Sequence, residues 1–182
     1  MTPAIFGLEG LAISSSERDF FRDSAPMGYI LFARNVQNRD QLRRLTDDLR
    51  DLHGTSSLPI LIDQEGGRVA RMQSPEWLSY PSASVFESVF ANNPEAAIRA
   101  CRANFEALAL DLAEVGITVT CAPVLDVPVD GAHDVIGDRA FSRDPKRVSA
   151  LGRACLEGLL AAGVDGVIKH IPAMGVRRLI PI

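Results

Sequence analysis

The chain has 182 residues, 47% of them hydrophobic and 23% charged, which suits one soluble globular domain with a buried core. The formal net charge is −4, and the sequence contains no run of basic residues. Both observations argue against nucleic-acid binding through a charged face. No apolar stretch approaches the ~20 residues that cross a bilayer, and the N-terminus does not resemble a signal peptide. We therefore expect a cytoplasmic protein with no membrane partner.

Signals for strands and helices alternate along the chain. Apolar runs typical of buried strands occupy residues 4–8, 27–34, 58–63, 118–127 and 164–172. Helical patterns occupy residues 14–25, 38–54, 93–116 and 144–163. Nearly continuous apolar strands that alternate with helices indicate a parallel sheet buried on both faces.

Capping residues mark the ends of several predicted helices. Ser16 and Asp19 have the spacing of a capping box for the first helix. Asn38 is a typical N-cap and Gly54 a typical stop for the second helix, whose leucines recur on one stripe. The third helix has Pro94 in its first turn.

An α/β chain of this kind predicts either a doubly wound sheet or a TIM (β/α)8-type barrel. The predicted strands end on polar residues, which are Arg34, Asp63, Asp126, Lys169 and His170. Barrels carry their chemistry at those carboxyl ends. A doubly wound sheet would more often show a Gly-rich phosphate loop after its first strand, which is absent here. We therefore favour the barrel, with about five of its β/α units in this chain.

The segment from Asp63 to Arg71 follows a buried strand directly. In a structural interpretation, Asp63 caps a turn, Gly66 and Gly67 permit a tight backbone, and the arginines pair with the carboxylates. In a functional interpretation, Asp63 accepts hydrogen bonds from sugar hydroxyls and an arginine donates to them.

Two further clusters allow the same two interpretations. In the structural interpretation, Asp126, Asp138 and Arg139 are charged residues of solvated loops. Lys169 and His170 end an apolar strand, where packing explains them poorly. Three widely spaced cysteines without a CxxC pair argue against a disulfide framework and a zinc site, and we expect no metal or organic cofactor.

Five strings occur in an order that resembles a known family. They are "YILFARNV", "IDQEGGRVARM", "APVLDV", "IGDRAFSRDP" and "KHIP". Together they are similar to family 3 glycoside hydrolases, specifically the bacterial cytoplasmic β-N-acetylhexosaminidases of peptidoglycan recycling. The resemblance implies a TIM barrel that removes terminal N-acetylglucosamine from muropeptides with retention of configuration. It also implies that the sugar-binding residues are Asp63, Arg71, Arg139, Lys169 and His170, with Glu65 and Arg68 as supports.

The family pattern breaks after Pro172. The family continues with Gly-His-Gly and Asp-Ser-His, which supply a histidine acid/base and its aspartate partner, and a later strand supplies an aspartate nucleophile. None of these catalytic residues occurs in this sequence, so we expect residues 1–172 to be part of a barrel and 173–182 to be an aberrant tail. Loss of one G from a plausible family gene sequence reproduces the tail as a frameshift, and an unrelated divergence of the C-terminus is the alternative.

An incomplete barrel leaves unpaired strand edges and apolar faces. We therefore expect self-association and no hydrolysis by these 182 residues. Two alternatives remain open, namely a non-catalytic protein that binds N-acetylglucosamine and another family 3 β-glycosidase.

Overall fold

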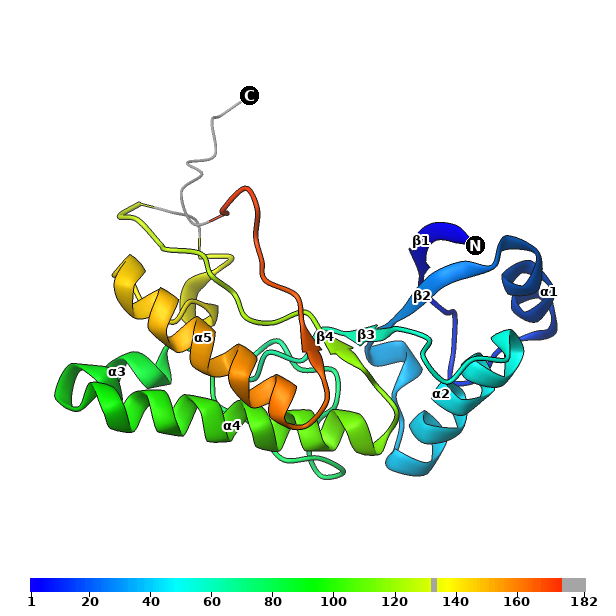
Figure 1. Ribbon diagram of the computed structural model, residues 1–182, viewed down its shortest axis with the longest axis horizontal. Coiled ribbons are helices and arrows are strands. Elements are labelled where there is room, and N and C mark those ends of the chain that lie inside the picture. The colour runs from blue at the N-terminus through cyan, green and yellow to red at the C-terminus, as the bar shows by residue number, and fades with distance from the viewer. Residues whose placement is uncertain (132–133, 175–182) are drawn as a thin grey trace.

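The computed structural model describes residues 1–131 and 134–174 (Figure 1). The strands are β1 (Thr2–Phe6), β2 (Pro26–Leu31), β3 (Ile60–Ile62), β4 (Val119–Thr120) and β5 (Asp165–Gly166). The α-helices are α1 (Ser15–Ser24), α2 (Arg39–His53), α3 (Val85–Asn92), α4 (Pro94–Glu114) and α5 (Pro145–Ala161). Two short 3-10 helices are η1 (Ala33–Asn35) and η2 (Gly137–Arg139). Of the predicted aberrant tail, only Ala173 and Met174 belong to the described residues.

The five strands form one parallel sheet in the order β1-β2-β3-β4-β5. A doubly wound sheet would reverse its strand order at a switch point, and no such reversal occurs among these strands. Each crossover in this order advances in the same direction, so right-handed connections place the helices on one face. This is the arrangement of consecutive strands in a barrel, which confirms the predicted fold class.

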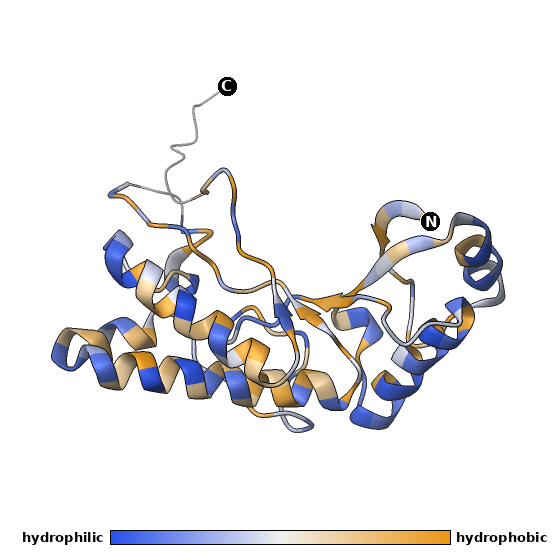
Figure 2. Cartoon of the chain, in the orientation of Figure 1, coloured by the Kyte–Doolittle hydropathy of each residue, from blue (hydrophilic) through white to orange (hydrophobic). Residues whose placement is uncertain are grey.

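Packing of the helices against the strands forms the core. Hydrophobic residues concentrate along the strands and on the adjoining sides of the helices (Figure 2). The largest fully buried side chains include Tyr29, Leu31, Leu42, Leu45, Leu49, Ile60, Ile62, Phe105 and Leu108. None of the helices in the described part of the chain is long and apolar enough to span a bilayer.

Helices α4 and α5 lie side by side along the sheet (Figure 1). They pack tightly at Gly158, where an added Cβ would lie 2.3 Å from the carbonyl oxygen of Arg102 and 2.9 Å from the amide nitrogen of Glu106. Both neighbours are backbone atoms of α4, so a side chain at this position would force the two helices apart.

Several local predictions were wrong. The N-cap of α1 is Ser14 rather than Ser16, and its capping-box partner is Glu17 rather than Asp19, because the helix begins earlier than the pattern suggested. Helix α3 lies within a segment predicted to be a loop. Strands β4 and β5 are much shorter than the apolar runs 118–127 and 164–172. By contrast, the caps at Asn38 and Gly54 and Pro94 at the start of α4 are confirmed.

We predict that Gly158→Ala lowers the free energy of unfolding by ~1–3 kcal/mol, because the methyl group collides with the backbone of α4. The higher helix propensity of alanine offsets only ~1 kcal/mol of this cost. Urea denaturation followed by circular dichroism measures the difference. Glu157→Ala, at the adjacent exposed position, is the matched control and should change stability by less than ~0.5 kcal/mol. Equal stability of both variants with the parent chain would contradict the close packing described here.

Candidate functional site

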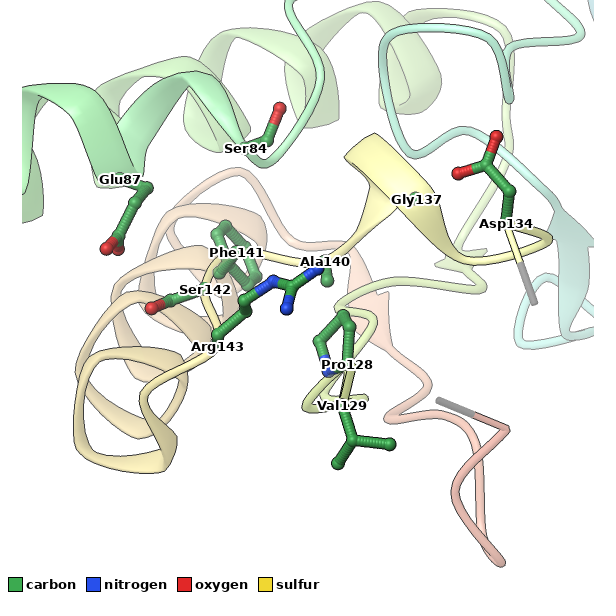
Figure 3. Close-up of a pocket in the computed structure, with 10 residues that line it drawn as sticks. All are labelled: Ser84, Glu87, Pro128, Val129, Asp134, Gly137, Ala140, Phe141, Ser142 and Arg143. Carbon is green, nitrogen blue, oxygen red and sulfur yellow. The ribbon is translucent and has the colours of Figure 1, made fainter. Parts of the chain in front are cut away.

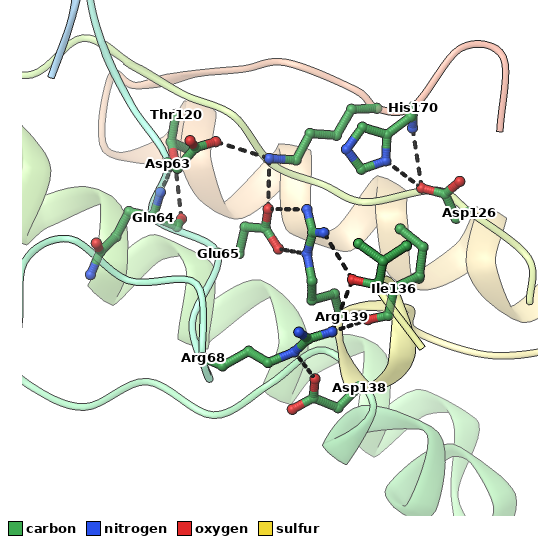
Figure 4. Close-up of polar contacts among 12 residues, drawn as sticks. Asp63, Gln64, Glu65, Arg68, Thr120, Asp126, Ile136, Asp138, Arg139 and His170 are labelled. Carbon is green, nitrogen blue, oxygen red and sulfur yellow. Dashed lines mark hydrogen bonds and ion pairs between the residues drawn. The ribbon is translucent and has the colours of Figure 1, made fainter. Parts of the chain in front are cut away.

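The polar residues predicted from the sequence gather at the carboxyl ends of the strands (Figure 4). Asp63 follows β3 directly, and Asp126 lies in the segment after β4. Lys169 and His170 follow β5, and Arg139 belongs to η2 in the β4–α5 connection. Because parallel strands end at the same edge of the sheet, residues far apart in sequence meet there.

Asp63 lies between two cations. Its Oδ1 accepts a hydrogen bond from Nζ of Lys169 at 3.1 Å, and its Oδ2 accepts one from Nη2 of Arg71 at 3.3 Å. Burial alone would raise the pKa of the Asp63 carboxyl, but Lys169 and Arg71 together outweigh it and hold the pKa below the ordinary 3.8. The group is therefore a carboxylate at neutral pH and an acceptor of hydrogen bonds rather than a general acid.

Glu65 is more enclosed than Asp63, with 7% of its side chain exposed against 23% for Asp63. Its Oε1 lies 2.6 Å from Nζ of Lys169, and both of its carboxylate oxygens accept hydrogen bonds of 2.9 Å from the guanidinium of Arg139. The hydrogen bond from Arg139 to Glu65 raises the pKa of that guanidinium, against the effect of burial. Glu65 thus joins the β3 loop to η2 and to the end of β5.

The sequence analysis predicted only a supporting role for Glu65 within its own loop, whereas the structure places it at the centre of the cluster. Its spacing of two residues from Asp63 was an available signal, because residues two apart in extended chain share a face. The structural interpretation had paired the arginines of the loop with its own carboxylates. Only Arg71 does so, with Asp63, whereas Glu65 pairs with Arg139 and Lys169.

Arg68 and Gln64 hold the β3 loop in place. Arg68 forms an ion pair of 2.9 Å with Asp138 and donates to carbonyl oxygens of the segment before η2. The side chain of Gln64 accepts hydrogen bonds from the amides of Arg71 and Met72 and donates to the carbonyl oxygen of Met72. The sequence offered no signal for the role of Gln64.

Gly66 and Gly67 have φ angles of 90° and 57°, a region that favours glycine. A Cβ at Gly66 would lie 2.4 Å from the carbonyl oxygen of Pro81, and one at Gly67 would lie 2.7 Å from Cβ of Ser82. The close approach that requires these glycines is therefore to Pro81 and Ser82.

His170 forms a second pair beside the cluster. Its Nδ1 lies 2.6 Å from Oδ2 of Asp126, and its backbone amide donates to the same oxygen at 3.3 Å. Asp126 is fully buried, whereas the His170 side chain is 25% exposed. The buried carboxylate fixes the orientation of the ring and leaves the Nε2 side of the imidazole as its polar outer edge.

Cys121 is a neighbour of Asp63 that the sequence analysis did not single out. Burial raises the pKa of the Cys121 thiol, and the Asp63 carboxylate beside it raises this pKa further. The side chain is therefore a neutral thiol at the wall of the cluster.

The side chains of this cluster are suited to forming hydrogen bonds with a polar ligand rather than to reacting with it. Three cations, Arg71, Arg139 and Lys169, face the two carboxylates Asp63 and Glu65. Carboxylate oxygens retain lone pairs for hydroxyl donors, while ammonium and guanidinium groups donate to hydroxyl or carbonyl oxygens. Among the residues that the structure describes, no group of three His, Cys, Asp or Glu side chains is placed to hold a metal ion.

A separate hollow of about 400 Å³ lies between α3, η2 and the segment that precedes α5 (Figure 3). Its lining includes Glu87, Pro128, Asp134, Phe141 and Arg143. None of the five predicted sugar-binding residues lines it, although η2 contributes both Gly137 to this hollow and Arg139 to the cluster. We therefore place the candidate site at the charged cluster and not in this hollow.

We predict that Lys169→Met raises the pKa of the Asp63 carboxyl, because Lys169 is the main group that lowers it. Carboxyl carbon NMR shifts recorded against pH measure this pKa. Lys146→Met, which changes the exposed second lysine, is the control and should leave the pKa unaltered.

The same interaction determines how stability depends on pH. A lowered folded pKa stabilises the fold above the unfolded pKa of ~3.9, and this contribution is lost as pH falls through the folded pKa. The stability difference between parent and Lys169→Met should therefore shrink on acidification. An identical Asp63 pKa in both proteins would refute the pairing.

Comparison with known proteins identifies the family of the chain. Residues 8–178 match the Glycosyl hydrolase family 3 N terminal domain. The chain is 36% identical over 171 residues to a beta-hexosaminidase of Xanthomonas campestris pv. campestris, covering 94% of this chain and 50% of that protein. It is 35% identical to a beta-hexosaminidase of Aromatoleum aromaticum, covering 95% of this chain and 48% of the relative.

Solved structures show the same fold. Native NagZ from Neisseria gonorrhoeae superposes with a TM-score of 0.90 at 33% identity, covering 96% of this chain and 50% of that one. The same TM-score and identity hold for NagZ in complex with N-trifluoroacetyl-D-glucosamine. The chain thus spans about half the length of the relatives it matches. It belongs to glycosyl hydrolase family 3 through that family's N-terminal domain.

Proposed function

We propose that the charged cluster binds a terminal N-acetylglucosamine unit. The observation that carries this proposal is the position of Asp63 at the carboxyl end of β3. Asp63 lies between Lys169 and Arg71, which lower the pKa of its carboxyl group and keep it ionised. Asp63 accepts hydrogen bonds from sugar hydroxyls, whereas Lys169, Arg71 and Arg139 donate to sugar oxygens. His170 adds an imidazole ring that is 25% exposed and is oriented by Asp126. The complex of NagZ with N-trifluoroacetyl-D-glucosamine supports a sugar of this class.

The reaction that we propose for the whole protein is removal of terminal β-linked N-acetylglucosamine from muropeptides in cytoplasmic peptidoglycan recycling. Retention of configuration requires an acid/base and a nucleophile that forms a glycosyl-enzyme intermediate. The histidine and aspartate that the family resemblance implies for these roles have no counterpart in the 182 residues. We therefore propose that residues 1–172 bind the sugar without hydrolysing it. Residues 173–182 supply no catalytic side chain in this proposal, and the described contact from them is the Met174 amide, which donates to Oδ1 of Asp126.

Two alternatives concern the same cluster. A protein that only binds N-acetylglucosamine would use these residues without any chemistry. Another family 3 β-glycosidase would prefer a glucoside, which lacks the acetamido group. The β-hexosaminidase names of the relatives favour the N-acetylated sugar.

We propose that the isolated chain self-associates through the edges of its described sheet. The edge strands β1 and β5 each have one neighbour in the described sheet, and unpaired edges invite contacts between chains. Such association would make the apparent mass rise with protein concentration.

Isothermal titration of the 182-residue chain with N-acetylglucosamine tests the proposed site. We expect saturable binding that Asp63→Asn weakens by about tenfold or more, because hydrogen bonds to a charged group contribute ~1.5–3 kcal/mol. Asp47→Asn, an exposed change on α2, should leave the affinity intact. A chromogenic N-acetyl-β-glucosaminide should not be hydrolysed.

Three results would go against this proposal. Equal affinity for glucose and N-acetylglucosamine would favour the other glycosidase, and undiminished binding by Asp63→Asn would move the site elsewhere. Turnover of the chromogenic substrate would disprove the purely binding role of these residues.

A further inference from the structure

Arg71 belongs both to the charged cluster and to a second hollow, which we call the Arg71 hollow. The volume of this hollow is about 280 Å³. Its lining residues include Gln37, Arg71, Gln73, Ser74, Glu76 and Trp77. They come from the segment after η1 and from the loop after β3. The other four residues predicted to bind the sugar do not line it, so Arg71 is the link between the cluster and the hollow.

The guanidinium group of Arg71 retains hydrogen-bonding capacity. Its Nη2 donates to Oδ2 of Asp63 at 3.3 Å, whereas its Nε and Nη1 have no hydrogen-bond partner among the described residues. The other oxygen of the Asp63 carboxylate lies 3.1 Å from Nζ of Lys169, so one negative charge is shared between two cations. The Arg71 side chain is 29% exposed. Two nitrogens of a charged group are therefore available as donors to a ligand in the hollow.

The rest of the lining adds further donors. Gln37 and Ser74 are exposed and contribute an amide and a hydroxyl group. Trp77 is only 4% exposed, and its Nε1, which can only donate, has no hydrogen-bond partner in the described part of the chain. Glu76 contributes a carboxylate, but this residue is exposed, so solvent and salt screen its charge. The partly buried donors of the hollow thus lack an acceptor.

We propose that the Arg71 hollow binds an anionic substituent, a carboxylate or a phosphate, carried by the sugar in the charged cluster. This inference rests on the proposed function and adds a property of the ligand that binding of N-acetylglucosamine does not require. Arg71 contacts Asp63 on one side and the substituent on the other. Charge-assisted hydrogen bonds from its remaining nitrogens hold the anion.

The charge of Arg71 argues against two other occupants of the hollow. An ammonium substituent would be repelled, because like charges in contact at a partly buried site destabilise each other. A neutral hydroxyl substituent would accept hydrogen bonds without a charge of its own, and such bonds are weaker than those between two ionised groups. An anionic oxygen group is therefore the occupant that gains most from this position.

Isothermal titration of the 182-residue chain with three sugars tests this subsite. They are N-acetylglucosamine, its 6-phosphate, and N-acetylmuramic acid, which carries a carboxylate on a lactyl ether at O3. We expect at least one anionic sugar to bind about tenfold more tightly than N-acetylglucosamine. The two anionic arms show which oxyanion the hollow accepts. The gain should shrink as NaCl is raised from about 10 mM to about 0.5 M, because salt screens a partly exposed ion pair.

Two variants locate the gain in the hollow. Gln37→Glu adds a negative charge there with almost no change in side-chain size. It should abolish the gain and leave the affinity for N-acetylglucosamine unchanged, because Gln37 lies outside the charged cluster. Asn92→Asp makes the same kind of change at an exposed position of α3 and should preserve the gain.

The outcomes separate this inference from the proposed function. Binding of N-acetylglucosamine with equal or weaker affinity for both anionic sugars would overturn the anionic subsite and leave the sugar site intact. A gain that Gln37→Glu does not reduce, or that Asn92→Asp reduces equally, would also overturn it, since the anion would then bind elsewhere. Absence of binding by all three sugars would contradict the proposed function and this inference with it.

Discussion

The ammonium group of Lys169 lies between Asp63 and Glu65, and the arrangement of the site depends on this contact. It joins the end of β5 to the end of β3, two strands that are separated in the sheet by β4. Glu65 extends the link to Arg139 in η2. Removal of any one member would leave a charge in a partly dehydrated position, which is costly. The polar network therefore fixes the relative position of three loops that the apolar core alone would leave adjustable.

The fold creates this network by bringing strand ends together. Apolar strands packed beneath helices α2, α4 and α5 determine where each strand stops, and the first polar residues beyond those ends meet at one edge (Figure 4). The same geometry that concentrates charge at the carboxyl ends leaves β1 and β5 as edges.

Much of this could be predicted from the sequence, because the alternation of apolar runs and helical stripes is strong. The parallel order, the caps at Asn38 and Gly54, and the strand-end location of Asp63 and Lys169 follow from such local patterns. Helix α3 and the role of Gln64 could not be predicted, since both depend on how a long loop folds back on itself. The central position of Glu65 depends on residues 74 and 104 positions away, Arg139 and Lys169, so pairing across the fold decided it.

The central claim is that the charged cluster, and not the hollow on η2, receives the sugar. A crystal structure of the 182-residue chain with N-acetylglucosamine tests it most directly. We predict that a hydroxyl of the sugar lies within hydrogen-bonding distance of the Asp63 carboxylate, with the ammonium group of Lys169 beside it. A sugar bound in the hollow lined by Glu87 and Phe141, with the cluster unoccupied, would contradict the claim.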